Sequence, residues 1–158
     1  LKVGITRHTQ IPTRWIDQGA TQAMILFRVS TRQQSGFIET AFKSLINDKT
    51  NWRAMLKGDA EPIDIEAEAN RLKDELSQQI DNLISEIGIE QIESVDEAET
   101  TIEYPVLEYP TKIKSHNLDK TPSIEGVLQG IKGQYLMMDT GVINMRKYTS
   151  YELTFSHE

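Results

Sequence analysis

The chain has 158 residues, of which 38% are hydrophobic and 26% charged, and its formal net charge is −7 at pH 7. This length and composition suit one ordinary globular domain or two small ones, and no apolar run reaches the ~18 residues that a membrane span needs. Because the chain contains no cysteine and shows no signal-peptide pattern, disulfides and thiolate metal sites are excluded within it, and we expect a cytoplasmic protein without a membrane partner.

The net charge conceals a strong asymmetry along the chain. Residues 1–58 carry nine Lys or Arg against three Asp or Glu, a net +6, whereas residues 59–103 carry two basic and fifteen acidic residues, a net −13. Residues 104–158 carry six of each and are neutral. A polyanion is therefore expected to meet the first segment and to avoid the second.

Residues 1–58 are predicted to form a small α/β unit. Leu1–Thr6 has the pattern of a short strand, and Pro12 and Gly19 suit the start of a short helix and the residue after its end. A buried strand is expected over residues 22–29. An amphipathic helix, capped by Ser30 or Thr31, is expected over residues 32–47, and a further helical turn over residues 51–56. Because Leu1 already belongs to a strand pattern, we interpret the chain as a fragment whose upstream residues complete one of the sheets.

Residues 59–100 are predicted to form an acidic helical segment. One long helix is expected from about Asp64 to Ile87, closed by Gly88. An apolar stripe runs along it, made of Ile65, Ala69, Leu72, Leu76, Ile80, Leu83, Ile84 and Ile87. With fewer than four heptads, packing of this stripe on the domain or on one partner helix is favoured over a coiled coil, and a helix-mediated homodimer stays open.

Residues 101–158 are predicted to form an antiparallel, β-rich, barrel-like part, which makes the expected fold class α+β. Asp139-Thr140-Gly141 indicates a tight hairpin in which glycine supplies a positive φ. Further turn signals separate the expected strands, which cover residues 101–107, 113–115, 124–131, 134–139, 142–146 and 151–155.

Basic side chains gather at the first predicted strand-to-helix junction. The strand delivers Arg7 and His8 to a loop, and the short helix presents Arg14 close by. Two guanidiniums at such a junction suit an anion of planar or phosphate geometry. The alternatives are that both are solvated surface charges, or that Arg14 is a structural arginine held by Asp17 or Glu39. If nucleic acid is the partner, one basic binding face is expected from Lys2, Arg7, His8, Arg14, Arg28 and Arg32.

Lys2-Val3-Gly4-Ile5-Thr6 followed by Arg14 resembles the second half of the GIY-YIG nuclease core, over residues 1 to about 48. In that family a strand leads to a helix with an essential arginine, and a later helix supplies a glutamate that binds one divalent metal. The resemblance implies a small GIY-YIG-like unit in which Arg14 and Glu39 are catalytic, with Arg14 clamping a phosphate and Glu39 binding Mg²⁺ or Mn²⁺.

This resemblance implies a nucleic-acid-processing protein that cleaves phosphodiesters with a divalent metal. One departure bears on that activity, because Lys2 occupies the position of the motif's tyrosine and cannot act as a phenolic general base. Whether the chain is an enzyme therefore stays open. The alternative is a non-catalytic module that binds nucleic acid or protein and keeps the fold without the chemistry.

The whole chain also resembles an uncharacterised bacterial family, DUF2797. The likeness is carried by residues 14–20 (RWIDQGA), 50–53 (TNWR) and 130–135 (GIKGQY). Members of that family carry an upstream cysteine-rich segment, which implies that any zinc belongs to a segment before Leu1. The family name supplies no activity.

Overall fold

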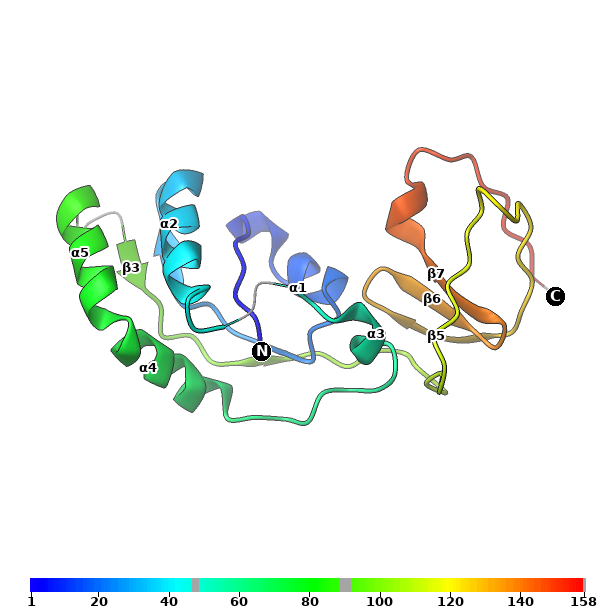
Figure 1. The fold of residues 1–158 in the computed structure, drawn as a ribbon, viewed down its shortest axis with the longest axis horizontal. Coiled ribbons are helices and arrows are strands. Elements are labelled where there is room, and N and C mark those ends of the chain that lie inside the picture. Colours follow the sequence, from blue (N-terminus) through cyan, green and yellow to red (C-terminus); the bar gives the residue numbers. More distant parts are fainter. Residues whose placement is uncertain (47–48, 89–91, 158) are drawn as a thin grey trace.

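The fold is described from a computed structural model, in which residues 1–46, 49–88 and 92–157 are placed well enough to describe. Most of the helices and two small sheets occupy one end of the elongated molecule, and a three-stranded sheet with its loops occupies the other (Figure 1). The described residues therefore form an α+β protein built on small antiparallel sheets. None of the described helices combines the length and the apolar character needed to cross a bilayer.

The chain begins without the predicted first strand. Residues 1–6 pair with none of the described strands, and the short 3₁₀ helix η1 (His8–Gln10) follows them. Helix α1 (Thr13–Asp17) then begins after Pro12, as its sequence predicts. Gly19 lies just past its end with a φ of 68°, a conformation that favours glycine because it has no Cβ.

The buried strand predicted over residues 22–29 is divided into two pieces. These are β1 (Gln22–Ala23) and β2 (Phe27–Val29), which belong to different two-stranded sheets. Their antiparallel partners are β4 (Thr100–Thr101) and β3 (Ile92–Ser94), respectively. The strand is divided because the segment that carries β3 and β4 pairs with β2 and β1 in two separate ladders, and no single ladder spans residues 22–29.

Helix α2 (Arg32–Phe42) is fixed by a capping box at its first turn. The Thr31 hydroxyl accepts a hydrogen bond from the Gln34 amide, and the Gln34 side chain accepts one from the Thr31 amide at 2.8 Å. The structure thus selects Thr31 from the two predicted caps. The helix ends before the predicted residue 47, which lies outside the described residues.

The predicted long helix is wrong in one respect, because it is two helices. These are α4 (Ile65–Glu75), capped by the Asp64 carboxylate, and α5 (Ser77–Ile87), closed by Gly88 with a φ of 110°. Leu76 lies between them with a ψ of 3°, outside the helical range, and is only 1% exposed. The bend at this buried residue sets α5 beside α2, whereas α4 runs along the lower edge in Figure 1.

The main core explains both the bend and the apolar stripe. Leu72, Leu76 and Ile80 of the stripe pack against Ile38 and Phe42 of α2. Leu83, Ile84 and Ile87 are half-buried against the same cluster. The stripe is therefore covered within this chain, in agreement with packing on the domain.

Residues 101–158 contain fewer strands than predicted, and the sheet does not close into a barrel. The described strands are β5 (Leu128–Lys132), β6 (Tyr135–Met138) and β7 (Gly141–Asn144), in that order in an antiparallel sheet, followed by the 3₁₀ helix η3 (Met145–Tyr148). The hairpin at residues 139–141 is confirmed by the pairing of Met138 with Gly141. Residues 101–107 and 113–115 contribute mainly single bridges beside β5 and β7, and residues 151–155 contribute no strand.

The two ends of the molecule contact each other through helix α3 (Trp52–Met55) and the end of α1. Trp52 stacks on Tyr135 of β6, with ring centroids 5.5 Å apart. The β5–β6 turn abuts α1, because a Cβ on Gly133 would lie 3.1 Å from the Asp17 carbonyl oxygen. Arg146 of η3 also pairs with Asp17 at 2.8 Å.

Candidate nucleic-acid interface

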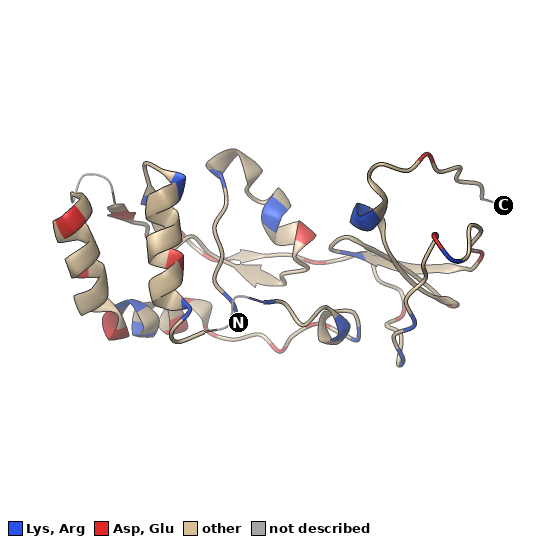
Figure 2. Cartoon of the chain, turned by 45° about the horizontal axis from the view of Figure 1, so that its top comes forward, with Lys and Arg blue, Asp and Glu red and all other residues tan. Residues whose placement is uncertain are grey.

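Three of the predicted site arginines are exposed and pair with no acid among the residues that the structure describes. Arg7 precedes η1, Arg14 is the second residue of α1, and Arg32 is the first residue of α2. Within residues 1–46, 49–88 and 92–157, none of their guanidiniums makes a hydrogen bond or an ion pair. We call these three side chains the arginine edge. In Figure 2, blue segments (Lys or Arg) lie in the upper part of the ribbon, where η1, α1 and the start of α2 are drawn.

The acids that were expected to hold Arg14 are occupied by other cations. Asp17 accepts a hydrogen bond from the Arg146 guanidinium at 2.8 Å. Glu39 pairs with Lys43, one helical turn later in α2, at 3.3 Å. The structure therefore gives Arg14 no internal carboxylate partner among the described residues, and its charge is presented to solvent.

The other two predicted cations are engaged inside the chain. Arg28 of β2 pairs with Glu97 at 2.9 Å and with Glu93 at 3.6 Å. The ammonium of Lys2 donates to the Gln18 side chain at 2.7 Å and to the Thr50 hydroxyl at 3.2 Å. The five Lys and Arg residues of the predicted binding face thus divide into an exposed, unpaired group and an engaged group.

His8 lies in η1, exposed, next to Arg7. Its imidazole makes no hydrogen bond to any other part of the chain that the structure describes. Its imidazole is therefore available to an anion, and its part in binding stays a prediction.

Glu39 is the one carboxylate predicted to bind a metal, and its surroundings offer little help. Its side chain is 20% exposed and its oxygen is bonded to Lys43. Among the residues that the structure describes, no three His, Cys, Asp or Glu side chains are grouped closely enough to hold a metal ion. Divalent metals that act in catalysis are usually held by two or more such groups. Glu39 and Arg14 also make no contact with each other that would assemble a single site.

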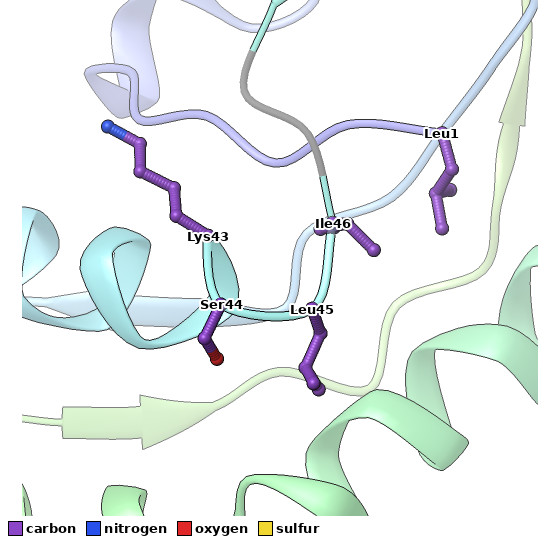
Figure 3. Close-up of a pocket in the computed structure, with 5 residues that line it drawn as sticks. All are labelled: Leu1, Lys43, Ser44, Leu45 and Ile46. Carbon is purple, nitrogen blue, oxygen red and sulfur yellow. The ribbon is translucent and has the colours of Figure 1, made fainter.

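The pocket at the end of α2 adds no catalytic group. It has a volume of about 320 Å³ and is lined by Leu1, Lys43, Ser44, Leu45 and Ile46 (Figure 3). Among the described lining residues, the one charged side chain is that of Lys43, which is already paired with Glu39. The other lining residues that the structure describes offer the Ser44 hydroxyl and apolar side chains.

Sequence reasoning missed a buried lysine at the junction of the two ends. Lys132, at the end of β5, is 1% exposed, and its ammonium donates to Asp59 at 2.6 Å, to the Gly58 carbonyl at 3.1 Å and to the Tyr109 hydroxyl at 3.2 Å. The Tyr109 hydroxyl in turn donates to Asp59 at 2.7 Å. A signal was present in the alternation of β5, which turns Ile131 outward and Lys132 toward the core.

These contacts and burial shift the pKa values of Asp59, Tyr104 and Tyr109. The hydrogen bonds from Lys132 and Tyr109 hold the pKa of Asp59 below its ordinary value. Burial raises the pKa of Tyr104, whose hydroxyl donates to the Ala20 carbonyl, to about 12. Burial and the bond to Asp59 also raise the pKa of Tyr109. Because every polar group here has a partner, we interpret the cluster as a structural clasp between the two ends.

The fold and this site define an α+β protein with small antiparallel sheets and an edge of unpaired arginines. A family profile described as a protein of unknown function (DUF2797) matches residues 1–153, and the chain belongs to that family. No curated protein and no solved structure matches the chain significantly. None of these comparisons supports the likeness of the N-terminal part to GIY-YIG nucleases.

Proposed function

We propose that this chain binds the phosphate backbone of a nucleic acid through the arginine edge. The observation that carries the proposal is that Arg7, Arg14 and Arg32 are exposed and unpaired among the described residues, whereas Lys2 and Arg28 are engaged. A guanidinium binds a phosphate through two parallel hydrogen bonds. An unpaired arginine can form these bonds without first breaking an internal ion pair.

The distribution of charge favours an approach from one side. Helix α4 carries Glu66 in its first turn, near Glu68, which pairs with Arg71 at 2.7 Å, and runs along the edge opposite η1 (Figure 1). Like charges repel a polyanion from that side, while the arginine edge attracts it. The overall net charge of −7 therefore does not oppose local binding at the arginine edge.

We propose binding without cleavage as the activity of this chain. Phosphodiester cleavage needs an activated nucleophile and stabilisation of the charge that develops at the phosphorus. Arg14 can supply part of the second requirement. The first requirement, an activated nucleophile, would need a bound metal ion near Glu39. Glu39 is poorly placed to hold one, because it pairs with Lys43 and has no neighbouring metal ligand among the described residues.

Binding is tested by fluorescence anisotropy with labelled duplex DNA, single-stranded DNA and RNA of equal length. Arg14→Ala is expected to weaken binding several-fold on every sequence, because a phosphate contact carries no base information. Arg28→Ala is the matched control, since its guanidinium already pairs with Glu93 and Glu97. Equal effects of the two substitutions, or no binding by the unmodified chain, would contradict the proposal.

Cleavage is tested on the same substrates with Mg²⁺ or Mn²⁺ added. We expect the unmodified chain and Glu39→Ala to leave the substrates intact. Product that forms with the unmodified chain and disappears with Glu39→Ala would show that the chain is a metal-dependent nuclease.

A further inference from the structure

A second pocket, lined mainly by polar residues, lies in the loop of residues 114–125 (yellow in Figure 1), at the end of the molecule that holds β5, β6 and β7. Its volume is about 330 Å³. Two lysines, one histidine and three hydroxyl side chains form most of its lining: Lys114, Lys120, His116, Ser115, Thr121 and Ser123. Glu125 supplies the one carboxylate and Ile124 the one aliphatic side chain of the lining.

The first part of this loop is held in place by β7. The His116 amide donates to the Val142 carbonyl at 2.8 Å, and the Val142 amide donates to the Lys114 carbonyl at 2.8 Å. Farther along, the amides of Lys120 and Thr121 both donate to the Asn117 carbonyl. The backbone that carries both lysines is therefore ordered by hydrogen bonds before any ligand binds, which lowers the entropic cost of binding.

The hydrogen bonds of His116 fix how its ring can serve a ligand. The Thr140 hydroxyl donates its single proton to the Glu125 carbonyl at 2.9 Å. It can therefore only accept in its 3.2 Å contact with His116 Nε2, so Nε2 carries a proton. In that tautomer the other ring nitrogen, Nδ1, is an acceptor.

The charges around the pocket leave its two lysines available. Lys114 and Lys120 are exposed and make no ion pair with the residues that the structure describes. The neighbouring acid Asp119 is occupied by Lys147 and by the Tyr151 hydroxyl. The Asp139 carboxylate accepts from the Val127 amide at 2.9 Å. Glu125 is the carboxylate that remains to interact with a ligand.

We propose that this pocket binds the phosphate group of a small molecule. Two ammonium groups act as point charges on a phosphate, and hydroxyl groups donate to its oxygens, while the neutral imidazole of His116 can accept only from a phosphate oxygen that carries a proton. The volume is at the lower end of the range of small-molecule sites, which favours a compact phosphate over a polymer. Glu125 can accept a hydrogen bond from a hydroxyl of an esterified ligand, so both inorganic phosphate and a phosphate monoester fit this chemistry.

Isothermal titration calorimetry with three probes tests the proposal: inorganic phosphate, adenosine 5′-monophosphate and adenosine. Binding of either phosphate probe, with none of adenosine, is the expected result. Tighter binding of the monophosphate identifies an ester as the ligand, whereas equal or tighter binding of inorganic phosphate identifies the free anion. Binding of adenosine as tight as that of its monophosphate, or no binding of either phosphate probe, would overturn the proposal.

Charge-removing variants locate the binding. The double substitution Lys114→Gln/Lys120→Gln is expected to weaken phosphate binding at least about tenfold, since each substitution removes a hydrogen bond from a charged ammonium group to the phosphate. Lys112→Gln is the matched control, because Lys112 is an exposed lysine just before the loop and outside the pocket lining. An equal loss in the control would show only general attraction to positive charge and would refute the site. All the substituted lysines are exposed, so unfolding temperatures should not change.

Discussion

The clasp formed by Lys132, Asp59 and Tyr109 predicts an unusual order of mutational effects. Removing the exposed partner should destabilise the protein more than removing the buried one. In Asp59→Ala, the ammonium of Lys132 stays 1% exposed and loses the carboxylate at 2.6 Å. In Lys132→Met, the carboxylate of Asp59 is left behind, but its side chain is 58% exposed and can be hydrated.

The magnitudes follow from these two environments. A hydrogen bond to a charged group contributes about 1.5–3 kcal/mol, so Asp59→Ala should lower the free energy of unfolding by about 2–3 kcal/mol. A buried ion replaced by an apolar side chain of similar shape is often close to neutral. We therefore expect Lys132→Met to lower the free energy of unfolding by about 1 kcal/mol or less, and the double variant to be more stable than Asp59→Ala alone.

Urea unfolding followed by tryptophan fluorescence measures all three variants. Trp52 is a suitable reporter because it stacks on Tyr135, close to the clasp. The midpoints should shift without a change in the slope of the transition. A larger loss in Lys132→Met than in Asp59→Ala, or a double variant less stable than both, would refute this account of the clasp.

Three further predictions concern pH and glycine. Because Lys132 lowers the pKa of Asp59, the stabilisation by Asp59 should be present above about pH 4 and be lost as the pH falls through the lowered pKa of the folded protein. Acid unfolding measures this loss, and an Asp59→Asn variant as sensitive to acid as the unmodified chain would contradict the prediction. Burial raises the pKa of Tyr104 to about 12, so its stabilisation should be complete below about pH 10 and be lost as pH rises toward 12. Because the chain has five tyrosines, the phenolate absorbance of Tyr104 is measured as the difference between the unmodified chain and Tyr104→Phe, and its appearance near pH 10 would contradict this. Gly19→Ala should lower the free energy of unfolding by more than about 1 kcal/mol, because Gly19 has a φ of 68°. Gly36→Ala should raise it by about 0.5–1 kcal/mol, because Gly36 lies within α2 and faces open space. Thermal unfolding that reverses the order of the two variants would contradict this prediction.

Much of the fold could be predicted where one local signal decides the structure. Thr31 caps α2, Gly19 follows α1, and Gly141 forms the hairpin, because each depends on residues within a few positions. The bend at Leu76 could not be predicted, since the apolar stripe continues through it without a helix-breaking residue. It arises from packing on α2, a contact between segments far apart in the sequence.

Local signals likewise predict part of the candidate sites, and contacts between distant segments decide the rest. The exposure of Arg7 and Arg14 follows from their places at a loop and a short helix. The pairing of Arg28 with Glu93 and Glu97 depends on how β3 returns to β2, which the sequence does not reveal. Lys132 finds Asp59 at a separation of 73 residues.

The salt dependence of nucleic-acid binding tests the central claim most directly. If Arg7, Arg14 and Arg32 each neutralise one phosphate of a duplex, the slope of log K against log salt concentration should be about −2.7. Arg14→Ala should make this slope less negative by about 0.9, while Arg28→Ala should leave it unchanged. A slope that Arg14→Ala does not alter would contradict the arginine edge as the binding site.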